Sequence, residues 1–209
     1  MIFSDEMLQE LREMVAARVS EKRFSHILGV ERCAKKLGDA LLPSYTSELR
    51  AAAILHDVSK EISYEEQLKL LEACGIPHDE EDKSTPGVLH SFTAPCIIRR
   101  DFPAFATDNI LSAVYNHTIG AEDMSVFDKI IFISDYIEDT RTYQSCVEVR
   151  NLLFEGFDSL SDKERKQRLD EACLASINGA LEALLRDNRP INSKMYKTKN
   201  SLIKNKFQS

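Results

Sequence analysis

The sequence predicts an all-α protein that folds as a single domain. A chain of 209 residues, 43% of them hydrophobic, is long enough for one well-filled core and short for two. Only 7 glycines and 6 prolines interrupt it, and alanine, leucine, glutamate and lysine recur at intervals of three and four residues. No stretch alternates apolar and polar residues for long enough to indicate a β-sheet.

Apolar spacing predicts the first three helices. One apolar face runs through residues 8–19, and a second runs through 24–41 and ends before Pro43. A third helix is expected to reach the His-Asp pair at 56–57, with Thr46 or Ser47 as its N-cap. The His-Asp pair is therefore expected at the end of a helix.

Capping signals predict the later helices. A serine followed three residues later by an acid marks the start of a helix. Thr107 is a further N-cap, and residues 89–100 are predicted to be helical despite Pro95. The intervening residues 75–87 are polar and read as a long loop. The serine–acid pairs are Ser63 with Glu66, Ser125 with Asp128, Ser145 with Glu148, and Ser161 with Glu164.

The chain divides into a domain of residues 1–190 and a basic C-terminal tail of residues 191–209. From Pro190 to the end there are five lysines and no acid, so subtracting five from the net charge of −7 leaves −12 for residues 1–189. This composition favours a solvated and partly disordered tail. A contact with nucleic acid or the ribosome is the alternative.

Charge and cysteine content exclude several classes of protein. A net charge of −7 argues against a nucleic-acid partner but allows a small anionic ligand at a metal site. Five scattered cysteines fit neither a disulfide framework nor a zinc ribbon, so we expect reduced thiols in the core. Acidic residues come too early for a signal peptide and no apolar run is long enough to span a bilayer, which predicts a cytoplasmic protein.

Histidines and aspartates form an ordered set along the chain. Taken singly, each histidine is more often a core or surface residue than a ligand, but four of the five occur beside acids or at expected helix ends. Imidazole and carboxylate groups suit iron, manganese, cobalt or zinc. Six ligands exceed what one open catalytic ion takes, and a carboxylate can bridge two ions, so two metals are expected. The candidate ligands are His26, His56, Asp57, His90, His117 and Asp135.

Four motifs in this order resemble the HD-domain phosphohydrolase superfamily, and within it the symmetrical diadenosine tetraphosphatases. The motifs are KRFSHILGV at 22–30, LHDVSK at 55–60, AVYNHTIG at 113–120 and DKIIFISDYIE at 128–138. The resemblance extends from about residue 22 to 191. It implies a single HD-domain helical bundle that hydrolyses diadenosine tetraphosphate to two ADP by attack of a metal-bound hydroxide.

The resemblance also implies how two divalent ions, expected to be iron with manganese, cobalt or zinc as alternatives, are held. Asp57 is expected to bridge the two ions and to be catalytic. His90 and His117 would hold the second ion. The first ion would be held by His26, His56, Asp57 and Asp135.

Five further residues are candidate substrate contacts. Lys60 is expected to stabilise a phosphate oxygen during the reaction, unless it is an exposed lysine paired with a neighbouring glutamate. Arg23 and Arg141 are expected to hold distal phosphates. Thr118 and Gly120 follow a helix end, where a hydroxyl and a backbone amide can approach a phosphate; a plain helix C-cap is an equal alternative.

Several alternatives remain open at this point. Ser91 and Asp139 stand where the family pattern has glycine and proline, and Ser91 beside the second metal is expected to narrow the pocket or alter substrate preference. The same centre can attack a nucleoside mono- or triphosphate or a cyclic dinucleotide instead. A non-catalytic nucleotide-binding regulator is a third hypothesis. The apolar stripe predicted on the long last helix can pack internally or across a homodimer.

Overall fold

Helices make up the whole regular structure of this computed structural model, which describes residues 2–208. Within that range there are eleven α-helices, four short 3-10 helices and no strand, so the predicted all-α fold class is confirmed. The 3-10 helices are Pro43–Tyr45, Pro86–Val88, Pro103–Phe105 and Phe157–Ser159. The α-helices are α1 (Asp5–Ala16), α2 (Glu21–Leu41), α3 (Thr46–Leu55), α4 (Tyr64–Ala73), α5 (Glu80–Ser84), α6 (Leu89–Asp101), α7 (Asp108–Asn116), α8 (Val126–Ile137), α9 (Gln144–Phe154), α10 (Asp162–Arg186) and α11 (Ser193–Gln208).

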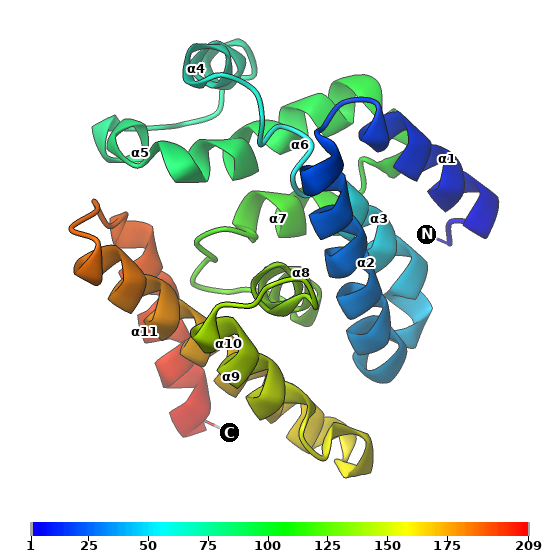
Figure 1. Ribbon diagram of the computed structural model, residues 1–209, viewed down its shortest axis with the longest axis vertical. Coiled ribbons are helices and arrows are strands. Elements are labelled where there is room, and N and C mark those ends of the chain that lie inside the picture. The colour runs from blue at the N-terminus through cyan, green and yellow to red at the C-terminus, as the bar shows by residue number, and fades with distance from the viewer. Residues whose placement is uncertain (1, 209) are drawn as a thin grey trace.

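Helix α8 lies at the centre of the bundle. Figure 1 shows it end-on, with α2, α7 and α10 around it, and these three helices all contact it. Its sequence explains the position, because Ile130, Ile131 and Ile133 are fully buried on adjoining faces. A helix that is apolar around most of its circumference must be enclosed by others. Residues carried by α8 are therefore held by packing on several sides.

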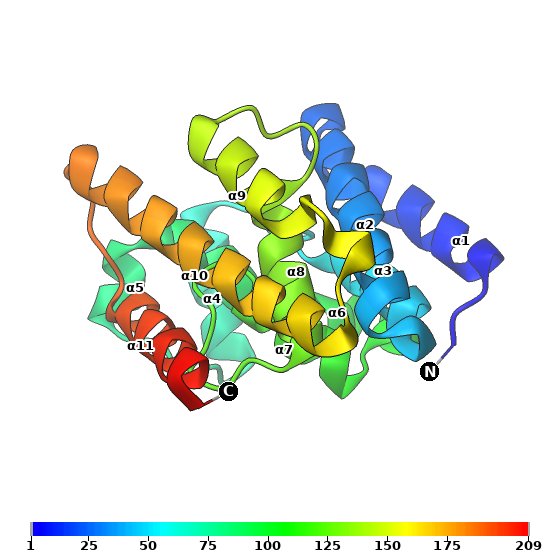
Figure 2. The same cartoon turned by 90° about the horizontal axis from the view of Figure 1, so that it is seen from below.

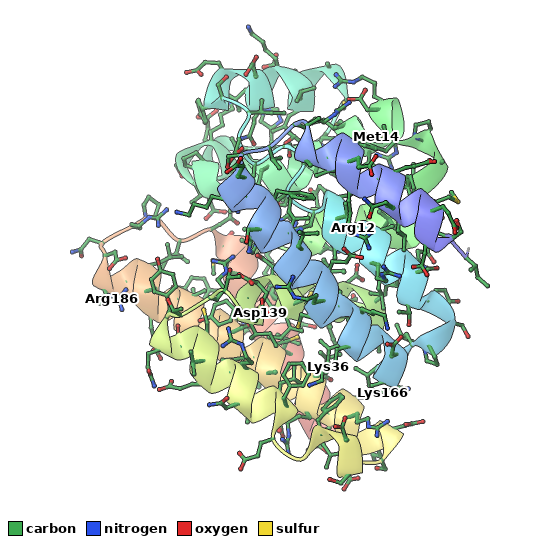
Figure 3. The ribbon with its side chains drawn as sticks, turned by 45° about the vertical axis from the view of Figure 1, so that its right-hand side comes forward. Arg12, Met14, Lys36, Asp139, Lys166 and Arg186 are labelled. Atoms are coloured by element: carbon green, nitrogen blue, oxygen red, sulfur yellow. The ribbon has the colours of Figure 1, made fainter. Side chains whose placement is uncertain are left out.

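The N-terminal helices are joined by a buried ion-pair network. Glu31 of α2 accepts hydrogen bonds from Arg12 of α1 at 2.6 and 2.7 Å and from Arg50 of α3 at 2.9 Å. Arg12, labelled in Figure 3, bridges α1 to α2. A buried carboxylate that accepts several charge-assisted hydrogen bonds fixes the relative orientation of the helices that supply them.

Three of the predicted serine capping boxes are present. The hydroxyls of Ser63, Ser125 and Ser161 each accept a hydrogen bond from the backbone N–H of the acid three residues later. The side chain of that acid accepts in return from the backbone N–H of the serine. Thr107 caps α7 as predicted, and α6 continues through Pro95 to Asp101. Local hydrogen bonding in these segments agrees with the global fold.

Two predicted caps are wrong. Helix α9 begins at Gln144 with Tyr143 as its N-cap, so Ser145 lies inside the helix. Helix α3 has Tyr45 as its N-cap and begins at Thr46, because the 3-10 turn before it leads directly into the helix. The hydroxyl of Ser47 instead accepts a hydrogen bond from the backbone N–H of Phe3.

Two segments expected to lack structure are helical. The predicted loop 75–87 contains α5, which Asp79 and Asp82 open as a capping box. The expectation of a partly disordered basic tail is wrong for α11, which packs along α10 as Figure 2 shows and buries Met195, Thr198 and Leu202. These three residues recur at intervals of three and four and form one buried face.

All five cysteines are free thiols. Cys96, Cys146 and Cys173 are buried, whereas Cys74 is exposed, so the expectation of core thiols fails at that position. None of the helices described combines the length and apolar character needed to cross a bilayer.

Candidate metal centre

The structure brings all six candidate ligands together at the middle of the bundle. They come from five segments: α2, the turn that ends α3, the start of α6, the end of α7, and α8. Nitrogen and oxygen atoms of three overlapping groups lie within 4.8 Å of one another. The groups are His26 with His56 and Asp57, His56 with His117 and Asp135, and Asp57 with His90 and His117.

Asp57 presents its two carboxylate oxygens to two different pairs of histidines. Its Oδ2 lies 3.4 Å from His56 Nε2 and 3.7 Å from His26 Nε2. Its Oδ1 lies 3.2 Å from His90 Nε2 and 3.7 Å from His117 Nε2. A carboxylate placed between two imidazole pairs has the arrangement that a ligand shared by two cations requires.

Asp135 completes the group on the Oδ2 side. Its Oδ1 lies 3.0 Å from His26 Nε2 and 3.9 Å from His56 Nε2. On the other side His90 Nε2 and His117 Nε2 lie 3.0 Å apart. The six side chains therefore divide into two sets that meet at Asp57.

Hydrogen bonds to backbone carbonyls fix two of the imidazole tautomers. His56 Nδ1 lies 2.7 Å from the carbonyl oxygen of Ala53, and His117 Nδ1 lies 2.7 Å from that of Val114. Because a carbonyl can only accept, each Nδ1 carries a proton, and in the neutral ring the Nε2 lone pair faces the centre and is free to bind a metal ion.

The donor set fits divalent cations. Among the described residues, Nε2 of His56 is buried without a hydrogen-bond partner, and the groups beside Nε2 of His26 are the carboxylates of Asp57 and Asp135. Buried polar atoms are rarely left unpaired, and a metal ion satisfies such lone pairs. Nitrogen and carboxylate donors without thiolate are the ligands of hydrolytic first-row metals.

Glu138 contacts a candidate ligand and was missed by sequence reasoning. Its side chain is 1% exposed, and its Oε1 lies 3.1 Å from His26 Nδ1. It also accepts hydrogen bonds from the backbone N–H and the hydroxyl of Thr140 at 2.7 and 2.6 Å. A Cβ at Gly29 would lie 2.2 Å from its Oε2, so only glycine there leaves it room. Glu138 thus orients the imidazole of His26, a candidate ligand, through its Nδ1.

Burial and charge set the protonation of the centre. Burial raises the pKa of Asp57, but the electrostatic effect of His56 and hydrogen bonds from the surrounding imidazoles outweigh it and hold this pKa well below its usual value. Burial lowers the pKa of His90 to about 3, which keeps its imidazole neutral. Burial also lowers the pKa of His26, but the carboxylates of Asp135 and Glu138 raise it to about 9.

Three cationic side chains border the centre. Arg23 Nη1 donates to Asp57 Oδ2 at 2.6 Å, and Arg141 Nη2 donates to Asp135 Oδ1 at 2.8 Å. Lys60 Nζ lies 3.2 Å from both ring nitrogens of His90, so its ammonium lies over that ring. Lys60 is partly buried rather than fully exposed, and burial lowers its pKa.

Thr118 and Gly120 differ in what they offer to a substrate. Thr118 Oγ1 lies 3.2 Å from His90 Nε2 and 3.1 Å from His117 Nε2, at the second set of ligands. The N–H of Gly120 donates to the carbonyl of Asn116 and its φ is 72°, in the turn that follows α7, whose C-cap is His117. The amide of Gly120 is thus paired within the chain, and its contact with a phosphate stays a prediction.

Two other residues singled out in the sequence make their hydrogen bonds to groups other than the candidate ligands. Ser91 donates its hydroxyl to the carbonyl of Val88 at 2.8 Å, within its own helix start. Asp139, labelled in Figure 3, pairs with Arg32 and is 61% exposed. Neither side chain is directed to the histidines by these contacts.

A cavity of about 660 Å³ adjoins the centre. Thr118 and Arg141 belong to both, and apolar residues of α10, among them Ala183 and Leu184, form one wall. Arg189 adds a second cationic side chain at its edge. This volume lies within the range of about 300 to 1,000 Å³ that small-molecule and cofactor sites occupy.

Comparison with known proteins defines the class. Residues 23–140 match the HD domain family, which is 118 of the 209 residues, and the chain belongs to this family. It is similar to a Bacillus subtilis protein named bis(5'-nucleosyl)-tetraphosphatase, symmetrical, with 26% identity over 93% of this chain and 97% of the relative. A Halalkalibacterium halodurans protein of the same name is 28% identical over 91% of this chain and 94% of its own length.

A solved structure shares the fold. The crystal structure of a predicted HD superfamily hydrolase involved in NAD metabolism, from Clostridium acetobutylicum, matches with a TM-score of 0.81 and 23% identity. The match covers 98% of this chain and 100% of that one. This likeness supports the fold, and the HD domain match over residues 23–140 confirms the predicted family: the chain is an HD-domain hydrolase whose clustered histidines and aspartates are able to bind metal.

Proposed function

We propose that this protein is a symmetrical diadenosine tetraphosphatase that cleaves the central anhydride of its substrate to give two ADP. The observation that supports it best is the placement of Asp57, with one oxygen toward each pair of histidines, beside a cavity of about 660 Å³. Relatives that bear the name of this activity match nearly the full chain.

Two divalent ions are part of the proposal, with iron preferred and manganese, cobalt or zinc as alternatives. When bound, they supply Lewis acidity that stabilises phosphate oxygens and lowers the pKa of water. His90 and His117 would hold one ion together with Asp57, the shared ligand. The other would be held by His26, His56, Asp57 and Asp135.

The cationic and hydroxyl side chains orient the phosphates. The Lys60 ammonium, above the His90 ring, is placed to neutralise charge on a phosphate oxygen at the second set of ligands. Thr118 can donate its hydroxyl at the same place. Arg23 and Arg141, each beside a ligand carboxylate, are placed to hold neighbouring phosphates.

The leaving group requires little help from the protein. Cleavage of the central anhydride expels ADP, a stable phosphate anion, so positioning and charge neutralisation suffice without a strong general acid. The cavity beside Thr118 and Arg141 would receive one nucleoside diphosphate half of the substrate. The cavity combines an apolar wall, which suits a nucleoside, with arginine side chains, which suit its phosphates.

Product analysis tests this proposal directly. Protein loaded with each candidate metal is incubated with diadenosine tetraphosphate, and the nucleotides are separated; ADP alone is expected. ATP together with AMP would contradict symmetrical cleavage. His117→Ala should abolish turnover and reduce the bound metal, whereas His78→Ala, which removes the histidine outside the centre, should match the wild type.

Other outcomes would favour the rival hypotheses. Rapid hydrolysis of a nucleoside mono- or triphosphate or a cyclic dinucleotide, without ADP from the dinucleoside tetraphosphate, would reassign the substrate. Bound metal without turnover of any nucleotide would favour a regulator. Loss of both metal and activity in Asp57→Ala would support the enzyme.

A further inference from the structure

The C-terminal helix α11 holds the α5 segment through an ion pair between the buried carboxylate of Asp82 and the partly exposed Lys194. Asp82 is 1% exposed, and Lys194 Nζ lies 2.6 and 2.7 Å from its two oxygens. Asn192 donates to the same carboxylate at 2.9 Å and to Thr85 Oγ1 at 3.1 Å. Lys194 also lies over the ring of Phe92 in α6, 4.8 Å from its centroid. Figure 2 shows the start of α11 beside α5.

The same helix holds the segment that follows α7. Thr198 donates its hydroxyl to the carbonyl of Ile119 at 2.9 Å. A Cβ at Gly120 would lie 2.4 Å from Thr198 Cγ2, so the backbone of this segment lies directly against α11. Ser201 donates to the carbonyl of Glu122 farther along. One face of α11 is thus fitted to residues 119–122.

Both segments held by α11 lead into the walls of the cavity. Residues 84–88 and 118–119 line it, and α11 itself contributes Met195. The Gly87 carbonyl lies 3.5 Å from Lys60 Nζ, and Thr118 lies against His90 and His117. The two walls are separate in the chain, and α11 contacts both.

We propose that α11 is a positioning element for the nucleotide cavity, with Lys194 and Asp82 as the positioning pair. This inference rests on the proposed function for the identity of the nucleotide. Loss of Lys194 would leave the Asp82 carboxylate buried with only Asn192 and the α5 start as partners, so the 79–88 segment would move toward water. The candidate metal ligands lie outside this segment. His90, the nearest of them, is 2% exposed in α6, and its carbonyl accepts a hydrogen bond from the Ser59 hydroxyl at 2.7 Å, so we expect the ligands to stay in place.

The test compares Lys194→Met with Lys197→Met, which removes the same charge from an exposed position of the same helix. For Lys194→Met we expect KM for diadenosine tetraphosphate to rise about tenfold with kcat and metal content nearly unchanged. Amide hydrogen exchange of residues 79–88 should become faster, and binding of ADP measured by calorimetry should weaken by a similar factor. Lys197→Met should match the wild type in every measurement.

A second variant covers the case in which Lys194→Met fails to fold. Thr198→Val keeps the shape but removes the hydroxyl that donates to Ile119, so it should speed exchange of residues 118–122 and raise KM. Unchanged exchange and ADP affinity in the folded variants would overturn the positioning role. Absence of ADP production by the wild type would instead refute the proposed function. In that case the amide hydrogen exchange and the ADP affinity of the variants would still decide the role of α11.

Discussion

Replacement of Glu138 by glutamine is the sharpest test of how the centre is built. The carboxylate accepts from His26 Nδ1 and the Thr140 hydroxyl on Oε1, and from the Thr140 N–H on Oε2. A glutamine has one accepting oxygen, and its amino group can only donate. In one orientation of the glutamine amide, its amino group faces the Thr140 N–H, so that two donors meet. In the other orientation, the amino group faces His26 Nδ1 and donates to it, which favours the tautomer whose proton lies on Nε2.

Either orientation weakens His26 as a ligand. Loss of a partner behind a metal-ligating histidine lowers metal affinity or activity by about 10- to 100-fold, which corresponds to about 1.4 to 2.8 kcal/mol. Because Glu138 is 1% exposed, water cannot replace the lost acceptor. We therefore expect metal affinity to fall within this range while the helical fold is kept.

The assay is a competition between the protein and a chelator of known affinity, with bound metal counted after dialysis. Asp139→Asn is the matched control, since it removes the charge of the neighbouring acid, which is 61% exposed and forms an ion pair with Arg32. A surface pair of this kind contributes about 0 to 1 kcal/mol. Equal metal affinity in Glu138→Gln and the wild type would refute the role given to this carboxylate.

Three more predictions concern the same elements. Gly29→Ala should reduce metal content although alanine favours helices, because the new methyl would meet Glu138 Oε2 at 2.2 Å; normal metal content would contradict this. Lys60→Met should lower kcat about 100-fold with metal content unchanged, and a wild-type kcat would exclude Lys60 from the reaction. Burial raises the pKa of Asp82, but hydrogen bonds from Lys194 and Asn192 hold it below 3.8. The stabilisation from the Asp82 carboxylate is therefore present above the unfolded pKa of about 3.9 and is lost as the pH falls further. The denaturation midpoints of the wild type and Asp82→Asn should then differ at pH 7 and converge in acid. A difference that stays constant with pH would contradict this.

The six candidate ligands could be chosen from sequence because their order along the chain carries information that no single histidine has. The structure brings all six together at one place, and their roles as ligands remain a prediction. Glu138 was missed because an acid three residues after Asp135, at the end of a helix, looks like any solvated acid. Its contact with the centre depends on His26, 112 residues away in the chain, which local sequence reasoning cannot place beside it.

The C-terminal helix was misjudged for a related reason. Its lysines dominate the composition, whereas its buried residues within 193–204, where burial is described, are Met195, Thr198 and Leu202, too few to signal packing. Asp79 and Asp82 did carry a capping signal, but the turn they open has no apolar residue among its five. Helices with strong apolar faces, such as α8, could be predicted because burial there is decided by local spacing.

The candidate ligands come from five segments of the chain, so the stability of the fold would depend on the supply of metal. An ion held by α2, α8 and the turn after α3 ties together parts of the chain more than 100 residues apart. A ligand that binds only the folded state stabilises it by about 2.7 kcal/mol when its free concentration is a hundred times the Kd. If the proposed ions are bound in this way, a cell short of the metal would lose some of this protein to unfolding and proteolysis, as well as losing the proposed activity.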